Sequence, residues 1–236
     1  MIGEATQGVR HVNTTRRREK RTVWLAPIAL LAAGLAAAPA VAQVASEGKG
    51  TLTIQVGQAS APFGGIAAAV ADPGVSASRD SLHALAFRFA AGYHFAEQVS
   101  AEVAVGHLGT MNSYAPYNGT DVLNVQTSLL VVEGDLIANI PIAPDARIDF
   151  TGGIAETGLQ SSITTQAGSA LPVGQNASDN VRRFGVTAGA DLEWRLGDVT
   201  SVLVGYHLYT HVGSSVLRDS ASGNVGAIFG GVRFQF

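Results

Sequence analysis

Large apolar residues recur at every second position in several stretches of the chain, and this alternation constrains the fold more than any other feature. Residues 82–95 show it most clearly. One side of that stretch reads Leu85, Phe87, Phe89, Ala91, Tyr93 and Phe95, and the other reads Ala86, Arg88, Ala90, Gly92 and His94. Successive side chains of a β-strand point to opposite faces of a sheet, so a period of two residues is typical of strands. The pattern therefore predicts strands with one apolar face.

The same alternation predicts eight strands, separated by connections of two kinds. The strands are expected at residues 51–58, 82–95, 99–108, 123–140, 147–157, 182–196, 199–211 and 224–236. Long polar loops at 59–80, 109–121, 158–180 and 213–223 alternate with short turns near 96–97, 141–145 and 197–198. Strands joined by such short turns must be antiparallel. We therefore expect an all-β, up-and-down antiparallel barrel.

The orientation of the two faces decides whether this barrel is soluble or lies in a membrane. Charged residues make up only 14% of the chain, against roughly 25% in soluble domains. The large residues Phe87, Phe150 and Trp194 would also overfill an eight-stranded interior. An inverted barrel, apolar outside and small or charged inside, resolves both difficulties, and closure leaves no sheet edge exposed to lipid. We therefore predict an eight-stranded transmembrane β-barrel.

Aromatic residues near the short-turn ends of the strands support a membrane location. They are Tyr93, Phe95, Phe150, Trp194, Phe234 and Phe236. Transmembrane barrels carry girdles of aromatic residues at the membrane interfaces. The alternative explanation is the general preference of aromatic residues for strands, but their clustering at one end favours a girdle.

The N-terminal segment has the three parts of a cleavable signal peptide. The positively charged segment RRREKR (16–21) precedes an apolar stretch, residues 23–42, that ends in the small residues Ala40-Val41-Ala42. We expect residues 1–42 to be the signal peptide, cleaved between Ala42 and Gln43, residues 43–50 a short periplasmic lead-in, and residues 51–236 the barrel. A retained membrane helix is the alternative. Without residues 1–42 the net charge falls from −3 to −7, which argues against nucleic-acid binding.

The signal peptide, the eight alternating strands and the closing residues GVRFQF (231–236) together resemble the small outer-membrane barrel families. These include the OmpA-type transmembrane domain, the opacity-type porin family and OmpW. The resemblance covers residues 51–236 and implies location in the outer membrane of a Gram-negative cell, with extracellular long loops and periplasmic turns. It also implies that the barrel-assembly machinery recognises the last strand through Phe234 and Phe236.

Charged residues on the predicted inner face form the main candidate site. By alternation they are Arg88, Arg147, Arg183, Arg195 and Arg233, against Glu102, Glu133, Asp135, Asp149, Asp191 and Glu193. An unpaired charge in a narrow lumen is costly, so we expect an ion-pair network. The hairpin register brings Arg88 within reach of Glu102, and Arg233 and Glu133 or Asp135 are candidates for the same network. Such a network either plugs the lumen or acts as the gate of a narrow pore; the plug is the simpler hypothesis.

A second candidate site is enzymatic. Some eight-stranded outer-membrane barrels hydrolyse lipid A acyl chains with a His and a Ser on one late strand, and His207, His211 and Ser214 or Ser215 resemble that arrangement. However, no Ser follows a His by two positions, and Asn224 or Gly226 stands where an acid would be needed. The two histidines are expected to share the inner face without a nearby inward carboxylate, which makes a poor metal site.

We expect a non-enzymatic outer-membrane protein with a structural or surface-interaction role through its extracellular loops. A narrow channel for small solutes is the first alternative and a lipid A deacylase the second. The expected partners are outer-membrane lipid and lipopolysaccharide, the barrel-assembly machinery and an extracellular ligand or host surface. No cofactor is expected, and the absence of cysteine rules out a thiolate metal site.

Overall fold

The computed structural model describes residues 49–61, 67, 70–71, 79–96, 98–117, 119, 121–166, 168, 170–171, 178–212 and 223–236. The signal peptide, the cleavage position between Ala42 and Gln43 and nearly all of the lead-in lie outside these residues. Most of the loop residues 62–78 and 213–222 lie outside them as well. Among the described residues, no helix has the length and apolar character needed to cross a membrane.

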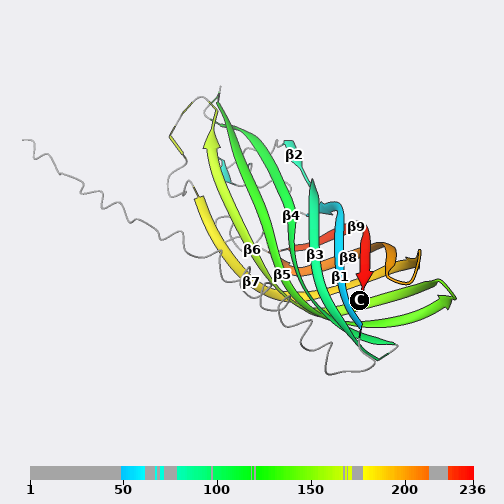
Figure 1. The fold of residues 1–236 in the computed structure, drawn as a ribbon. Coiled ribbons are helices and arrows are strands. Elements are labelled where there is room, and N and C mark those ends of the chain that lie inside the picture. Colours follow the sequence, from blue (N-terminus) through cyan, green and yellow to red (C-terminus); the bar gives the residue numbers. More distant parts are fainter. Residues whose placement is uncertain are drawn as a thin grey trace, which may run out of the picture.

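Nine strands are found in the described part of the chain (Figure 1). They are β1 (Lys49–Ser60), β2 (Arg79–Ser81), β3 (His83–Ala96), β4 (Val99–Tyr117), β5 (Asp121–Ala143), β6 (Ala146–Thr165), β7 (Ser178–Arg195), β8 (Thr200–Val212) and β9 (Gly223–Gln235). The three-residue strand β2 pairs with β4 and extends the line of β3.

The other eight described strands close into a barrel. Their order is β4-β3-β1-β9-β8-β7-β6-β5, and the pairing of β4 with β5 closes the ring. All of these pairs are antiparallel. The predicted eight-stranded, up-and-down barrel is therefore confirmed.

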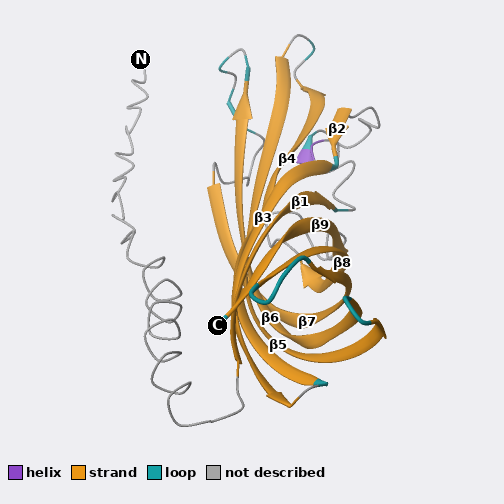
Figure 2. Cartoon of the chain, turned by 45° about the vertical axis from the view of Figure 1, so that its right-hand side comes forward, coloured by secondary structure: helices purple, strands orange, loops and turns teal. Residues whose placement is uncertain are grey.

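The barrel wall is much taller on one side than on the other. Strands β4, β5 and β6 have 19, 23 and 20 residues, whereas β1, β8 and β9 have 12, 13 and 13. Figure 2 shows the long strands rising well above the short ones at the loop end. The expected loops 109–121 and 158–180 are thus partly wrong, because β4 continues to Tyr117 and β6 to Thr165. In these segments the buried residues Met111 and Ser113, and Leu159, Ser161 and Ile163, recur at every second position, so the strands continue.

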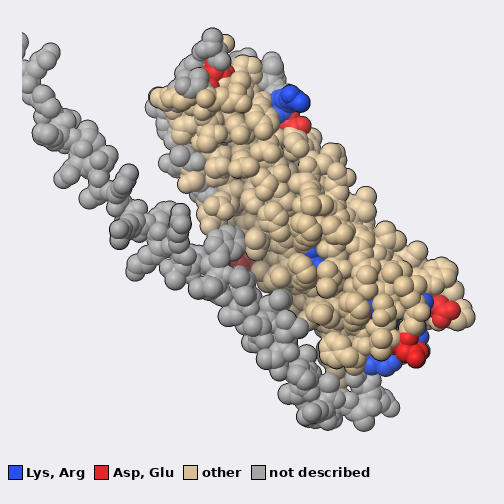
Figure 3. Space-filling view, turned by 45° about the horizontal axis from the view of Figure 1, so that its top comes forward, with Lys and Arg blue, Asp and Glu red and all other residues tan. Residues whose placement is uncertain are grey.

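Large apolar side chains cover the outside of the barrel. Phe184, Ile154 and Trp194 are 76%, 68% and 55% exposed. In the face drawn in Figure 3, charged atoms gather toward the two ends and the broad surface between them is almost free of charge. Such a surface suits hydrocarbon rather than water. The predicted orientation, with apolar residues outside, is confirmed.

The interior has two layers, of which only the charged one was predicted. Toward the short turns the buried residues are mainly polar or charged. Toward the loops they form an apolar cluster that includes Leu123, Leu129 and Phe229. Ala67, Val70 and Ala71 of the first loop belong to this cluster, and the Ala67 N–H donates to Ser113 Oγ at 3.0 Å. Part of the predicted first loop therefore folds into the barrel mouth.

At the seam between β1 and β9, glycine allows two backbones to approach closely. A Cβ on Gly57 would lie 2.8 Å from the carbonyl carbon of Ile228 and 2.9 Å from Phe229 Cα. We expect Gly57→Val to destabilise the barrel by about 1–3 kcal/mol, the usual effect of overpacking. The temperature at which the folded form disappears on a semi-native gel measures this loss. Gly152→Val is the matched control, since nothing lies within 4 Å of its Cβ position; equal effects of the two substitutions would contradict the prediction.

Candidate functional site in the barrel lumen

Arg88 lies in the lumen, only 2% exposed, and binds side chains from three other strands. Its Nε donates to Glu133 Oε1 of β5 at 2.5 Å and its Nη2 to Glu102 Oε1 of β4 at 2.5 Å. Its Nη1 donates to Gln55 Oε1 of β1 at 2.9 Å, and Asp135 Oδ2 lies 3.4 Å from Nη2. The predicted pair between Arg88 and Glu102 is confirmed.

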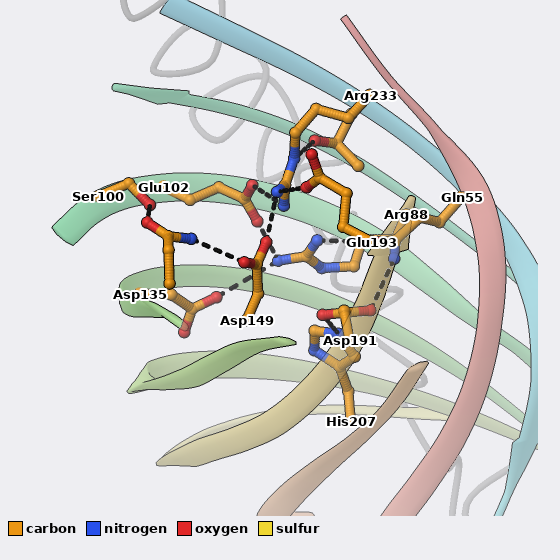
Figure 4. Close-up of polar contacts among 12 residues, drawn as sticks. Gln55, Arg88, Ser100, Glu102, Asp135, Asp149, Asp191, Glu193, His207 and Arg233 are labelled. Atoms are coloured by element: carbon orange, nitrogen blue, oxygen red, sulfur yellow. Dashed lines mark hydrogen bonds and ion pairs between the residues drawn. The ribbon is translucent and has the colours of Figure 1, made fainter. Parts of the chain in front are cut away.

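Arg233 of β9 forms the second centre of the network (Figure 4). Its Nη1 donates to Asp149 Oδ2 of β6 at 2.5 Å and also to Glu193 Oε2 of β7. Its Nε donates to Thr53 Oγ1 at 3.1 Å, and Glu102 Oε2 lies 3.8 Å from Nη2. Glu133 and Asp135, which were expected in the same network as Arg233, belong to it through Arg88 and do not contact Arg233 directly. Glu102 lies between the two arginines and links them.

Arg147 and the Asp191–His207 pair extend the network at its edges. Arg147 Nη2 donates to Glu193 Oε2 at 2.9 Å. His207 Nε2 lies 2.9 Å from Asp191 Oδ2, and Asp191 Oδ1 accepts a hydrogen bond of 3.3 Å from Gln55 Nε2. Through these contacts all eight barrel strands, in the part of the chain that is described, contribute to one connected set of side chains.

The Asp191–His207 pair corrects the expectation that no inward carboxylate lies near His207. In the β7–β8 hairpin Asp191 pairs with Gly205, so His207, two residues further along β8, lies diagonally across from it. Gly205 makes room for the carboxylate, since a Cβ there would lie 2.7 Å from Asp191 Cγ. The short turn at residues 197–198 fixes this register. Pairing the residues of β7 and β8 one by one from that turn would have predicted the contact between Asp191 and His207.

His211 does not share the inner face with His207. A β-bulge interrupts the β8–β9 register between Tyr209 and Val212. His211 adopts a positive φ of 58° there, so its side chain is exposed and Val212 is buried instead. The predicted pairing of the two histidines on one face is therefore wrong, and Ser214 and Ser215 lie outside the described residues. Within those residues, no group of three or more His, Asp or Glu side chains could hold a metal ion.

Arg183 also lies outside the lumen network, contrary to prediction. The pairing of β7 with β8 extends only as far as Thr187, so Arg183 stands on the taller part of the wall. There the inward side of the strand is no longer enclosed, and the side chain is exposed. Arg195, at the opposite end of β7, is exposed as well. Alternation gave the correct side of the strand for both residues but not their height in the barrel.

The buried network carries an excess of negative charge. Three guanidinium groups, those of Arg88, Arg147 and Arg233, face six carboxylates. The six are Glu102, Glu133, Asp135, Asp149, Asp191 and Glu193. Each arginine is therefore shared between several acids, and the loss of one arginine leaves more than one carboxylate without a counter-charge.

The two residues of the predicted assembly signal lie at the closing seam. Phe234, in β9, and Phe236, just beyond it, are 41% and 62% exposed on the outer surface. The backbone of Phe236 exchanges hydrogen bonds of 2.9 and 3.0 Å with Gly50 of β1. Both residues therefore lie where the first and last strands meet, and their recognition by the assembly machinery stays a prediction.

Several solved barrels share this fold. OprG of Pseudomonas aeruginosa is 10% identical, with a TM-score of 0.50 over 80% of this chain and 96% of that one. A major outer membrane protein of Thermus thermophilus is 10% identical, with a TM-score of 0.51 over 80% and 99% of the two chains. Ail of Yersinia pestis is 13% identical, with a TM-score of 0.43 over 79% and 99%.

OprG and the Thermus thermophilus protein indicate a shared fold and, at such low identity, nothing more specific. No curated protein sequence matches the chain. The family model of the outer membrane protein beta-barrel domain, however, matches residues 28–236, which is most of the chain. The closed ring of antiparallel strands, the apolar outer surface and this match agree, and the chain belongs to the outer membrane protein beta-barrel family, located in the cell outer membrane.

Proposed function

We propose that this outer-membrane barrel is non-enzymatic, that its lumen is closed, and that it has a structural or surface-interaction role through its extracellular loops. The observation that carries the proposal is the filled lumen. The ion-pair network joins all eight barrel strands in the described part of the chain. Arg88, Tyr209 and Phe229 are among the largest fully buried side chains of the described residues.

Two successive layers oppose passage of a solute. The charged layer would have to open by separating buried ion pairs such as Arg88–Glu133 and Arg233–Asp149, and an unpaired buried charge is strongly unfavourable. Above it, the buried apolar cluster with Ala67 and Val70 would have to be crossed by a hydrated ion, and an apolar environment disfavours a charge. Small barrels are commonly filled by side chains in this way.

The histidines favour a non-enzymatic role over a lipid-hydrolysing one. His207 is 1% exposed and is held by Asp191 inside the lumen, whereas His211 is exposed at the loop end of β8. A catalytic group must reach its substrate. Within the described residues, the hydrogen-bond partner of His211 is Thr210 and not an acid such as the one that holds His207.

Conductance measurements test the closed lumen directly. We expect purified wild-type protein to give no single-channel events in planar bilayers. Arg88→Ala is also expected to give none, because the apolar layer is left intact. A porin inserted under the same conditions shows that events would be detected. Discrete conductance steps from the wild-type protein would contradict the closed lumen, and steps from Arg88→Ala alone would identify the network as a gate.

A further inference from the structure

Two neighbouring grooves lie on the outer surface of the barrel at its loop end. The lower groove has a volume of about 430 Å³ and crosses β8, β9 and β1. The upper groove has a volume of about 1050 Å³ and crosses β2, β4 and the loop ends of β5 and β6. Leu82 and His83 line both grooves. Together they form one surface running from the low wall to the tall wall.

Small residues produce the lower groove. In the strand register Leu208 pairs with Gly226, Gly226 with Ser60, and Ser60 with His83. Gly226 and Ser60 thus form a low floor between larger neighbours. The ring of Tyr206 leans over Gly226, because a Cβ there would lie 2.8 Å from Tyr206 Cζ.

The next row of cross-strand neighbours, one step closer to the short turns, belongs to the band of exposed apolar side chains around the barrel, the apolar belt. Tyr206 pairs with Ile228, Ile228 with Gln58, and Gln58 with Leu85. Ile228 and Leu85 are each 61% exposed on the outer face, as expected for residues that contact hydrocarbon. The lower groove therefore opens at the top of the belt, in the leaflet on the loop side.

The upper groove combines cationic or hydrogen-bonding groups with flat apolar surfaces. Arg79 and His83 are exposed, and Arg79 pairs across the strands with Tyr114. Pro116 contributes a second flat surface. Asp80 also borders the groove, but its carboxylate accepts a hydrogen bond from the buried Ser113 and so is directed toward the interior. The groove thus presents an arginine and a histidine beside an aromatic ring.

We propose that this paired surface binds a phosphorylated glycolipid of the outer leaflet, that is, lipopolysaccharide. The upper part of an acyl chain occupies the lower groove. The sugar headgroup lies in the upper groove, against Tyr114 and Pro116, with a phosphate at Arg79 and His83. Guanidinium groups bind phosphate through paired hydrogen bonds, and both volumes are in the range of small-ligand sites. The order of apolar groove and then basic groove along the membrane normal matches the order of acyl chain and phosphosugar in such a lipid.

Titration of fluorescent bisphosphorylated lipid A into nanodiscs of phosphatidylcholine that contain the purified protein tests this site. We expect saturable binding by the wild type, stronger than its binding of dephosphorylated lipid A or phosphatidylglycerol. The double substitution Arg79→Gln and His83→Gln removes the phosphate donors and should weaken binding about tenfold. Ser60→Trp fills the lower groove and should weaken it by a similar factor.

Arg182→Gln is the matched control, because Arg182 is an exposed arginine of β7 paired with Glu156 and lies in neither groove. It should bind lipid A as the wild type does. The heat-dependent gel shift confirms that each variant is folded. Equal affinity of wild type and both groove variants would overturn the proposal, as would wild-type binding that does not discriminate between lipid A and phosphatidylglycerol. Neither result depends on whether the lumen conducts.

Discussion

Arg88→Met is expected to lower the free energy of unfolding by about 3–5 kcal/mol, the range found when one partner of a buried ion pair is removed. The substitution keeps most of the side-chain volume, so the loss comes from charge and hydrogen bonding rather than from a cavity. Glu102 and Glu133 would each lose a hydrogen bond of 2.5 Å from the guanidinium group. Because the network already has three more acids than arginines, no other described arginine can replace Arg88.

Asp135→Asn is the matched control in the same cluster. Asp135 is the most distant of the acids around Arg88, at 3.4 Å, and its Oδ1 makes no hydrogen bond within the described residues. The amide keeps the shape and an acceptor oxygen while it removes one acidic group from a cluster that has more acids than arginines. We therefore expect stability unchanged to within about 1 kcal/mol, or increased.

Urea titration of the refolded barrel in detergent or lipid, followed by gel mobility, measures both variants. If Arg88→Met unfolds at the same urea concentration as the wild type, the network is not a main source of stability. If Asp135→Asn is destabilised as strongly as Arg88→Met, the excess of negative charge is not what makes Arg88 important. A variant that never folds would agree with the first prediction, and Asp135→Asn would then still test the charge argument.

The second large effect is expected on the outer surface. Val204→Arg should destabilise the membrane-inserted barrel by about 2–4 kcal/mol, the cost of a cation near the bilayer midplane. Val204 is 53% exposed on β8, about midway between the turn at residues 197–198 and the loop end. In a water-soluble barrel the same exposed substitution would be nearly neutral, so the measurement tests the inverted orientation itself.

Val199→Arg is the control for depth. Val199 is 58% exposed and directly follows the short turn, where the membrane interface is expected. An arginine at that level can reach water, and the expected loss is only about 0–1 kcal/mol. Unfolding of both variants in lipid vesicles gives the comparison; equal losses at the two positions would place the apolar belt at a different height.

Hairpin contacts were predictable from sequence, whereas contacts across the lumen were not. Arg88 and Glu102 lie in one hairpin with a short turn, so alternation and turn length together bring them into reach. Arg233 and Asp149 are 84 residues apart in sequence. Their contact depends on the stagger of the strands around the closed barrel, which no local pattern encodes. The failure to exclude Arg183 from the network has the same cause.

Local irregularities were also beyond the reach of a periodic pattern. The bulge after Tyr209 inserts an extra residue into β8, so the face predicted for His211 is reversed. The inward fold of Ala67 and Val70 could not be read from a Gly- and Ala-rich stretch, because small residues are compatible with both an exposed loop and a buried plug. Both features lie at the loop end, where turn chemistry no longer restrains the register.

The sequence by itself determined the strands, the short turns and the face of each strand that meets lipid, since these follow from a two-residue period and from the scarcity of charge. Only the tertiary structure decided how high each strand rises, which inward charges meet across the lumen, and that an apolar layer covers the charged one. The physical reason is that alternation specifies the direction of a side chain. Its position along the barrel axis depends on how all eight strands are staggered when the ring closes.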